Sequence, residues 1–501
     1  MDDDKRSLEV DELPRISTGN AGLDDILGGG IDPERMYLFE GQPGSGKTTL
    51  ALEFLLEGVR AGEPTLYITL SESERELRLV ARRHGWSLNG ITIFELIPPE
   101  TTLDPSQELT VLHPAEMELS ETTQMIFDRV EALAPARIVL DSLSELRLLA
   151  QNPLRYRRQI LALKHFFSGR KSTVVLLDDL SSQQNDLQLH SIVHGVVLLE
   201  QLAIDYGAQR RRLRVVKMRG IDFKGGFHDF TIRHGGLRVY PRLVAAEHHK
   251  KFDSDVVSSG NAELDTLLGG GLERGTNALL IGAAGVGKSS LALTYAIAAA
   301  ARNERSVIFA FDEGRGTMKA RAKTLGLPLK ESLENGLITI QQIDPAEMAP
   351  GEFANAVRGS VESDNARVVI IDSLNGYLNR FLILQMHELL SYLSQCGVLT
   401  ILVLAQHGLV GPMDTPLDIS YLADGVLMLR YFEFDGSVRR ALSVVKKRSG
   451  NHEHTIREFK LSQHGITVGP PLKGFSGIFS GTPLYKGEEA PLMSRDTDDR
   501  G

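Results

Sequence analysis

The stretch GQPGSGKTT, from Gly41 to Thr49, constrains the fold of this 501-residue chain more than any other part of the sequence. A second copy, GAAGVGKSS, runs from Gly282 to Ser290. In each copy an apolar run leads into a glycine-rich turn and then into a helical pattern, which is the strand–loop–helix context of a phosphate-binding loop. Backbone N–H groups of such a loop, with the positive end of the following helix, cradle the β- and γ-phosphates of a nucleotide. The complete context of both copies disfavours the alternative, a glycine-rich turn that binds nothing.

The residue types within each loop predict its contacts with ATP and Mg²⁺. The lysines reach the terminal phosphates as point charges, and the hydroxyls that follow, Thr48 and Ser289, are candidate Mg²⁺ ligands. The predicted nucleotide-binding residues are Gly41, Gly44, Ser45, Gly46, Lys47, Thr48 and Thr49 in the first copy, and Gly282, Gly285, Val286, Gly287, Lys288, Ser289 and Ser290 in the second.

The two loops belong to an internal repeat. TGNAGLDDILGGG at 18–30 matches SSGNAELDTLLGGG at 258–271, and Thr18 and Lys47 each recur 241 residues later, as Ser259 and Lys288. Strands that alternate with helices predict βαβ units on a parallel sheet, with ligands at the carboxyl ends of the strands. The predicted fold class is therefore α/β, with two tandem P-loop domains, each with a mainly parallel central sheet flanked by helices.

A second pair of motifs predicts the metal site of each domain. ARIVLDSLSEL at 136–146 matches ARVVIIDSLNG at 366–376, and each is an apolar strand that ends in Asp-Ser. These are Walker B strands, and their aspartates, Asp141 and Asp372, are expected to hold Mg²⁺ through its water shell, because Mg²⁺ prefers octahedral oxygen ligands.

Hydrolysis also needs a base or a water-positioning group, and the acids that end the preceding strand are the candidates. They are Glu72 in the first copy, after Ser71, and the adjacent pair Asp312 and Glu313 in the second. Successive strand residues point in opposite directions, so the sequence leaves open which acid faces the γ-phosphate. The simpler interpretation is that these acids only solvate a strand end.

Two basic pairs lie late in each copy. Lys217 and Arg219, in VVKMRG, and Lys446 and Arg448, in VVKKRSG, alternate along a strand and so present two cations on one face. Such a pair can reach the nucleotide of a neighbouring subunit as arginine-finger-like residues. The alternative is a solvated edge strand. The run of arginines at 210–212 has no interleaved aromatic residues of the kind that single-strand binders use for stacking.

Between and around the motifs, the sequence predicts an N-terminal arm at 1–15, domains at 16–243 and 258–469, a linker at 244–257 and a tail at 470–501. The adjacent His248 and His249 fit a solvated linker better than a metal site, since no partner ligands stand at metal-site spacing. The last ten or so residues of the tail are rich in charge and are expected to be disordered.

Composition restricts the setting. The net charge of −10 gives the chain as a whole no electrostatic footprint for nucleic acid, so nucleic-acid binding is not expected. A single cysteine permits no intrachain disulfide and favours a reducing, cytoplasmic setting. The N-terminus lacks the layout of a signal peptide, and no apolar run approaches membrane-spanning length.

With these motifs placed, the chain resembles the KaiC family, the tandem RecA-like ATPases of the cyanobacterial clock and their relatives in other bacteria. The L-D-x-x-L-G-G-G lead-in, the Walker pair, the K-x-R strand and the segment GFSGIFSGTP at 474–483 fall in family order over nearly the whole chain. The resemblance implies two-tier homohexamers that bind ATP between subunits, with an ATPase first tier and a second tier that acts as autokinase and autophosphatase. It implies that the basic pairs act in trans, and that a KaiB-like protein is a partner.

The resemblance also implies phosphorylation sites and three departures. Ser420 and Tyr421 occupy the positions of the family's serine and threonine, and Thr415 matches another family hydroxyl. Tyrosine in place of threonine argues for a single-site Ser420 cycle. Ser71 replaces one of two adjacent glutamates, so if the lost acid is the base, the first tier loses about 10²–10⁴-fold in rate. The tail ends soon after the family segment, which argues against a KaiA-type partner.

The leading hypothesis is therefore a hexameric, ATP-hydrolysing KaiC-like protein with serine/threonine autokinase activity in its second domain, serving as a signalling or circadian timing module. One alternative is a RecA-like DNA-handling ATPase, for which the shared fold is only an analogy. The other is a nucleotide-gated scaffold that binds ATP and assembles but scarcely turns over.

Overall fold

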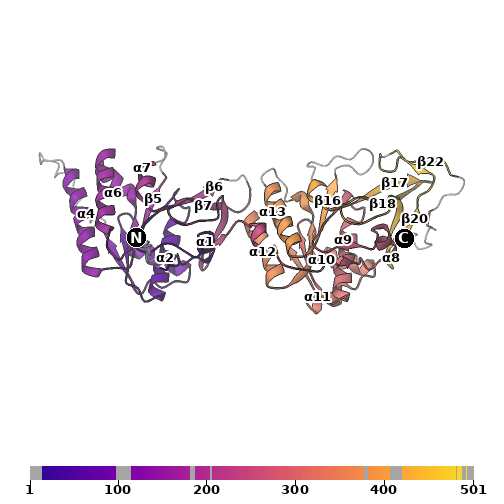
Figure 1. Cartoon of the computed structure of the whole chain (residues 1–501), viewed down its shortest axis with the longest axis horizontal. Coiled ribbons are helices and arrows are strands. Elements are labelled where there is room, and N and C mark those ends of the chain that lie inside the picture. The colour runs from indigo at the N-terminus through magenta and orange to yellow at the C-terminus, as the bar shows by residue number, and fades with distance from the viewer. Residues whose placement is uncertain are drawn as a thin grey trace, which may run out of the picture. The chain divides into compact units, whose positions relative to one another are not determined.

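The computed structural model describes residues 14–96, 114–180, 187–203, 206–376, 382–406, 420–480, 482–487 and 492–493. The chain divides into two compact units, Met1–Arg242 and Leu243–Gly501 (Figure 1).

The first unit follows the predicted alternation of strands and helices. Its elements in chain order are α1 (Ala21–Ile26), β1 (Met36–Gly41), α2 (Lys47–Arg60), β2 (Thr65–Thr69), α3 (Glu74–Arg83), β3 (Ile91–Glu95), α4 (Pro114–Leu133), β4 (Arg137–Asp141), α5 (Leu143–Ala150), α6 (Pro153–Phe167), β5 (Thr173–Asp179), α7 (Leu187–Ile192), β6 (Gly195–Leu202), β7 (Arg210–Met218), β8 (His228–Arg233) and β9 (Gly236–Tyr240).

The second unit repeats this order. Its elements are the 3-10 helix η3 (Ala245–Glu247), β10 (Val256–Val257), α8 (Ala262–Leu267), β11 (Leu272–Glu273), β12 (Asn277–Ala283), α9 (Lys288–Ala301), β13 (Arg305–Ala310), α10 (Arg315–Thr324), α11 (Leu329–Glu334), β14 (Ile338–Gln342), α12 (Pro350–Glu362), β15 (Ala366–Asp372), η4 (Leu374–Gly376), α13 (Leu382–Gln395), β16 (Leu399–Gln406), η5 (Ser420–Leu422), β17 (Gly425–Phe434), β18 (Ser437–Lys447), β19 (Arg457–Ser462), β20 (Gly465–Pro471), β21 (Phe475–Ser476) and β22 (Leu484–Tyr485).

Each unit is built on a nine-stranded sheet with the same strand order. The orders are β3-β2-β4-β5-β1-β6-β7-β8-β9 and β14-β13-β15-β16-β12-β17-β18-β19-β20. Neighbours from the first-named strand to β6 or β17 pair in parallel, and the last three pairings are antiparallel. The predicted α/β class with two tandem, mainly parallel P-loop domains is confirmed.

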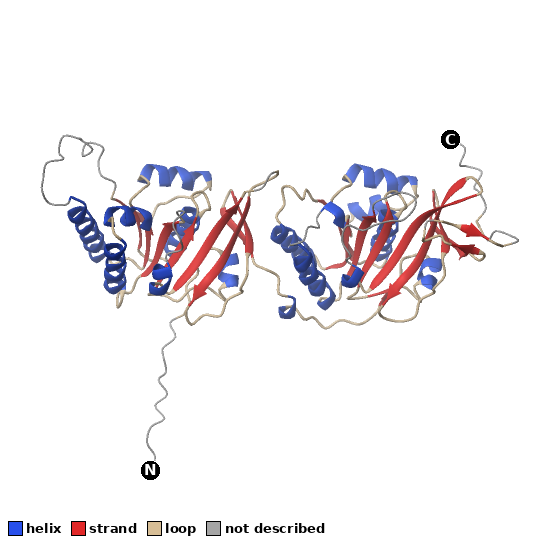
Figure 2. Cartoon of the chain, turned by 90° about the horizontal axis from the view of Figure 1, so that it is seen from above, coloured by secondary structure: helices blue, strands red, loops and turns tan. Residues whose placement is uncertain are grey.

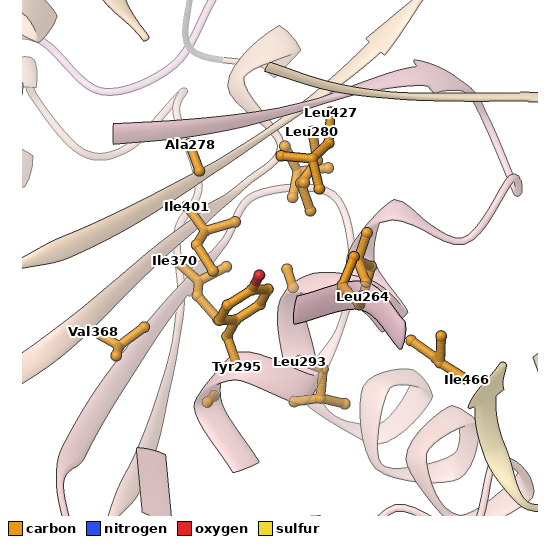
Figure 3. Close-up of a cluster of buried hydrophobic side chains, with 14 of the residues drawn as sticks. Leu264, Ala278, Leu280, Leu293, Tyr295, Val368, Ile370, Ile401, Leu427 and Ile466 are labelled. Atoms are coloured by element: carbon orange, nitrogen blue, oxygen red, sulfur yellow. The ribbon is translucent and has the colours of Figure 1, made fainter. Parts of the chain in front are cut away.

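Helices cover both faces of each sheet, and a hydrophobic core lies on each side of it (Figure 2). The central strands β4 and β15 read as almost unbroken apolar runs because a parallel sheet is buried on both faces. In the second unit Tyr295 of α9 projects among strand side chains such as Ile370 and Ile401 (Figure 3). Phe54 of α2 is the fully buried residue at the matching position of the first unit.

The segment expected to link the domains lies partly against the second unit. Ala245 packs in a core cluster of that unit, and the ring of His248 stands edge-on to Tyr392 with centroids 5.1 Å apart. His248 Nδ1 also lies 3.6 Å from a carboxylate oxygen of Glu362. Part of this segment therefore has tertiary contacts of its own.

Candidate nucleotide sites

Each glycine-rich loop joins the end of a buried strand to the start of a long helix. Gly46 and Gly287, which precede α2 and α9, have φ angles of 104° and 111°, in the left-handed region that glycine adopts readily. A Cβ atom at Gly287 would lie 2.8 Å from the Phe459 ring and 3.0 Å from Leu461. Neither helix start has a side-chain cap, so its first N–H groups are available to phosphate oxygens.

The loop lysine of the first unit is buried and faces its own loop. Lys47 Nζ donates to the carbonyl oxygens of Gly41 at 2.8 Å and Gln42 at 3.1 Å. It also forms an ion pair of 2.7 Å with Asp179 at the end of β5. The ammonium is therefore held where the terminal phosphates of a bound nucleotide would lie.

Among the residues that the structure describes, the loop lysine of the second unit donates only to carbonyl groups. Lys288 Nζ donates to Gly282 at 2.8 Å and Ala283 at 2.6 Å. Burial lowers the pKa of Lys288 to about 8, and the nearby Asp372 opposes that shift. A phosphate anion would add a second negative charge beside this buried ammonium and favour its charged form.

Sheet register brings the Walker B aspartates to the loops. In the first unit Asp141 is paired with Thr69 on one side and Leu177 on the other, at the carboxyl edge where β1 ends. Thr48 Oγ1 lies 3.5 Å from Asp141 Oδ2, and the hydroxyl of Tyr67 donates to the same oxygen at 2.5 Å. Burial raises the pKa of Asp141 and also keeps Tyr67 protonated by raising its pKa well above 10.

The second unit has the same arrangement without the tyrosine. Asp372 is buried, which raises its pKa, and a hydrogen bond from Ser289 opposes that shift. The hydroxyl of Ser373 donates to Asp312, which brings the first acid of the strand-end pair to the Walker B turn.

These residues fit Mg²⁺. No group of three or more His, Cys, Asp or Glu side chains that could hold a metal occurs among the described residues, and this includes His248 and His249. Mg²⁺ in nucleotide sites needs only one or two protein oxygens, with phosphates and waters as the other ligands. The hydroxyl and carboxylate pairs Thr48–Asp141 and Ser289–Asp372 supply these hard oxygen donors, and Mg²⁺ would neutralise charge on the phosphates.

The strand-end acids differ in exposure. Glu72 and Glu313 are the half-buried members, and burial together with the nearby Walker B aspartate raises the pKa of each. In the second unit Arg321 opposes that shift through an ion pair of 2.9 Å with Glu313. Ser71 and Asp312 are exposed. Ser71 of the first copy corresponds to Asp312 of the second. The acid that the first copy lacks is therefore the exposed member of the pair.

Sequence reasoning missed the acids at the end of β5. Asp178 accepts from Arg147 at 2.6 Å and from Ser144 at 3.1 Å, whereas Asp179 pairs with Lys47. The available signal was the Asp-Asp pair that follows an apolar strand. Its partner could not be read from the sequence, because the contact depends on β5 lying beside β1.

A cavity of about 370 Å³ opens beside the second loop. It is lined by loop residues that include Gly287, Lys288 and Ser289, and also by Arg321, Thr324, Leu325 and Leu461. The loop residues of this lining suit the phosphates of a nucleotide, and its leucines suit the base.

The basic pairs lie away from the loops of their own units. Val196 of β6 is level with Leu38 of β1 on one side and with Lys217 on the other. Leu38 precedes the loop by several residues, and β7 runs on toward the amino end of β1, so Arg219 lies farther still from the loop. In the second unit Lys446 is level with Val426 in the same way.

Each basic pair contacts the carbonyl groups of the short helix that precedes β6 or β17. Lys217 donates to His190 and, at 2.8 Å, to Val193, and Arg219 donates to Ser191 at 2.7 Å. Burial lowers the pKa of Lys217. The pairs are therefore held at the sheet edge that is remote from their own nucleotide loop.

In the second unit this contact involves the predicted phosphorylation sites. Lys446 Nζ donates to the carbonyls of Ser420 at 2.9 Å and Ala423 at 2.8 Å, and Arg448 donates to the carbonyl of Tyr421 at 3.0 Å. Ser420 is half-buried, and Tyr421 is exposed. Thr415 lies outside the described residues.

The basic strand of the first unit contains an aromatic contact that the sequence did not indicate. Phe227, from the segment between β7 and β8, lies 3.8 Å from the Arg212 guanidinium and 5.2 Å from that of Arg214. Arg212 is also paired with Glu200 at 2.6 Å, which neutralises part of the patch.

Two phosphate-binding loops, each with a Walker B carboxylate at the same sheet edge, define a tandem P-loop nucleotide-binding protein. The family model for the KaiC ATPase matches residues 16–244 and again residues 257–473, so the chain belongs to the KaiC family. The resemblance predicted from the motifs is confirmed, and it supports ATP binding. No helix among the described residues is long and apolar enough to cross a membrane.

Curated relatives match over nearly the full length. The chain is 26% identical to the circadian clock protein KaiC3 of Synechocystis sp. (strain ATCC 27184 / PCC 6803 / Kazusa), over 95% of this chain and 96% of that protein. It is 27% identical to the circadian clock oscillator protein KaiC of Acaryochloris marina, over 96% of this chain and 92% of that protein. The chain is 25% identical to the circadian clock oscillator protein KaiC of Synechococcus elongatus, over 96% of this chain and 94% of that protein.

Proposed function

We propose that the chain is a homohexameric, cytoplasmic ATPase of the KaiC type, whose second domain phosphorylates its own Ser420, and that it serves as a signalling or timing module. One observation carries the proposal. Each domain has a complete loop and Walker B aspartate, yet holds its basic pair at the sheet edge remote from that loop. This arrangement supports a site in which a second copy of the chain supplies the basic pair and ATP lies between subunits.

In the second domain, the proposed reaction transfers the γ-phosphoryl group from ATP to the Ser420 oxygen. The bond between the β–γ bridging oxygen and the γ-phosphorus breaks, ADP leaves, and the serine proton passes to Glu313 or Asp312. The contact between Lys446 and the Ser420 carbonyl supports this assignment, because it places the acceptor and the trans-acting cations on one edge. The acceptor therefore meets the nucleotide of a neighbouring copy.

In the first domain, the proposed reaction is hydrolysis of ATP with Glu72 as the candidate base. Glu72 is half-buried beside Asp141, and its raised pKa suits a group that accepts a proton from water near neutral pH. Ser71 stands where the second domain has the exposed Asp312. We therefore expect the absence of an acid at this position to lower the hydrolysis rate less than removal of Glu72 would.

The test is incubation of the purified full chain with Mg²⁺ and γ-labelled ATP, followed by mass spectrometric mapping. We expect phosphate on Ser420, none in Ser420→Ala, and none in Lys288→Ala. Unmodified Ser420 in protein that binds and hydrolyses ATP would remove the kinase part and leave the ATPase part.

A nucleotide-gated scaffold is the first alternative. If assembly depends on nucleotide in the first domain, Lys47→Ala dissociates the hexamer and Lys288→Ala does not, as measured by size-exclusion chromatography with light scattering. Hexamers unaffected by Lys47→Ala contradict that division of labour. A scaffold without an ATPase would assemble normally and show no release of phosphate.

A DNA-handling ATPase is the second alternative, and the contact of Phe227 with two arginines is the observation that favours it. The net charge of −10 and the pairing of Arg212 with Glu200 oppose it. Salt-dependent binding to single-stranded DNA that stimulates ATP hydrolysis would support this alternative. As a protein partner we propose a KaiB-like protein, on the strength of family membership alone.

A further inference from the structure

A buried phenol lies against the Walker B aspartate in the first domain only. Tyr67 is in β2 and has no exposed surface, and its ring packs in the core on one face of the sheet. Its hydroxyl donates to Asp141 Oδ2 at 2.5 Å. Thr48 lies 3.5 Å from that same oxygen. One atom of the aspartate thus meets both the core and the phosphate-binding loop.

Register identifies the equivalent position in the second domain. Thr69 pairs with Asp141 in the first sheet, and Ala310 pairs with Asp372 in the second. Two residues earlier on the same strands stand Tyr67 and Ile308. Ile308 is buried in the core and offers no hydrogen-bond donor. Asp372 therefore has the loop donor Ser289 without a tyrosine beside it, whereas Asp141 has both Thr48 and Tyr67.

This difference has a consequence for the metal. A buried carboxylate that already accepts a charge-assisted hydrogen bond on one oxygen is held in one orientation, and its other oxygen remains free to accept from metal-bound water. In the first domain the core adds the Tyr67 donor to the longer hydrogen bond from Thr48, and the Thr48 oxygen keeps lone pairs for the metal. In the second domain Ser289 is the only one of these two kinds of donor, since Ile308 stands where the first domain has Tyr67.

We propose that Tyr67 is a positioning residue of the first domain's Mg²⁺ site, which orients Asp141 from the core and so makes the first site bind the metal more tightly than it otherwise would. The proposal rests on the proposed function, in that it assumes MgATP as the ligand of this domain. Tyr67 would not touch the metal itself but contacts Asp141 from the core, and Ile308 stands at the equivalent position of the second domain.

The test uses the full chain carrying Lys288→Ala, which silences the second loop. Mn²⁺ replaces Mg²⁺ as an electron paramagnetic resonance probe, and its dissociation constant is measured with a non-hydrolysable ATP analogue bound. We expect Tyr67→Phe to raise that constant about tenfold, because one charge-assisted hydrogen bond is lost. Binding of the analogue in EDTA should not change.

The matched control is Tyr37→Phe. Tyr37 is an equally buried tyrosine of the same sheet, whose hydroxyl donates to the Asp32 carbonyl at 2.8 Å, away from the loop. We expect this variant to leave the Mn²⁺ constant unchanged even if its melting temperature falls as much as that of Tyr67→Phe.

Three outcomes would overturn the inference. An unchanged Mn²⁺ constant in Tyr67→Phe makes the hydrogen bond structural only. An equal loss of metal-free analogue binding shows that the loop itself was disturbed. If the Lys288→Ala parent binds no analogue, the proposed function of the first domain fails as well, which distinguishes that failure from the other two.

Discussion

At the scale of single residues, the two nucleotide sites differ in how the loop lysine is balanced. Asp179 stands opposite Gly41 in the first sheet and pairs with Lys47, whereas Ala405 stands opposite Gly282 in the second. An incoming phosphate must therefore compete with a carboxylate that is paired with the loop lysine in the first domain, whereas among the described residues Lys288 forms no such ion pair and has only Asp372 nearby. Asp179 is partly exposed, so solvent weakens its ion pair with Lys47, and the two domains should differ only modestly in their free energy of phosphate binding for this reason.

We expect Asp179→Asn to strengthen ATP binding to the first domain about three- to tenfold, since the phosphates no longer compete with a carboxylate for Lys47. Titration with a fluorescent ATP analogue in the Lys288→Ala background measures this. The reciprocal control, Ala405→Asp in the Lys47→Ala background, should weaken binding to the second domain. Weaker binding in Asp179→Asn would show instead that the carboxylate takes part in holding the nucleotide.

Glu53 gives the first domain a distinct dependence on pH. Its carboxylate is buried and accepts from Asn20 Nδ2 at 2.9 Å and from the Leu237 backbone N–H at 2.6 Å. Burial nevertheless raises the pKa of Glu53 to about 7. Because the folded state holds the proton more tightly than the unfolded state, this group's stabilising contribution is complete below its unfolded pKa of 4.5 and is lost as pH rises to about 7.

We therefore expect the stability of the first domain, relative to that of Glu53→Gln, to fall by on the order of 3 kcal/mol between pH 4.5 and pH 7. Trp86 is the only tryptophan and lines the same cavity as Glu53, so its fluorescence during urea unfolding reports on this domain. A difference that stays constant across this range would mean that the carboxylate is already charged in the folded state.

At the scale of elements, the strands and loops that could be predicted are those with local signals. The β1–loop–α2 and β12–loop–α9 units and the apolar strands β4 and β15 follow from glycine spacing, buried runs and the repeat. The contacts of Asp179 with Lys47 and of Tyr67 with Asp141 could not be predicted, because they join strands that are neighbours in the sheet but distant in the sequence. The same holds for the remoteness of the basic pairs from their own loops.

The tail is an element whose packing the sequence did not indicate. Residues 470–480 and 482–487 lie within the second unit, and β21 and β22 form a hairpin. Ile478 packs with Phe432 and Leu472 in a small cluster of its own, and the ring of Phe475 contacts Phe434 with centroids 5.2 Å apart. Scattered aromatic residues among glycines have no periodicity, so the composition resembled that of a flexible tail.

We expect Ile478→Ala to undock this hairpin, because the buried side chain is only 1% exposed and its truncation costs about 2–4 kcal/mol. Limited proteolysis followed by mass spectrometry should show faster cleavage within 470–487. Leu484→Ala is the control from the same hairpin, since Leu484 is 60% exposed and its truncation should leave the cleavage rate unchanged. Equal rates for both variants would mean that the cluster does not hold the tail.

At the scale of the whole molecule, the repeat yields two domains with one fold and different side chains around their loops. Both place a loop at one edge of the sheet and a basic pair at the other. Under the proposed function a single copy therefore carries the donor half of one site and the acceptor half of another. An interface that joins unlike edges closes into a ring when its rotation allows it. The proposed function therefore requires contact between copies in each domain.

This arrangement predicts a direction for phosphorylation. In Lys288→Ala the loop fails but the basic pair and Ser420 are intact, whereas in Arg448→Ala the loop is intact and the pair is incomplete. When the two variants are mixed and allowed to reassemble, about a quarter of the interfaces should combine an intact loop with an intact pair. Phosphate should then appear on Ser420 of the Lys288→Ala copies alone, because they receive it from the ATP of their neighbours. Mass tags on the two variants distinguish the copies, and each variant incubated alone is the control. Phosphate confined to the Arg448→Ala copies would mean that each loop serves the serine of its own chain, and the proposed interface would be wrong.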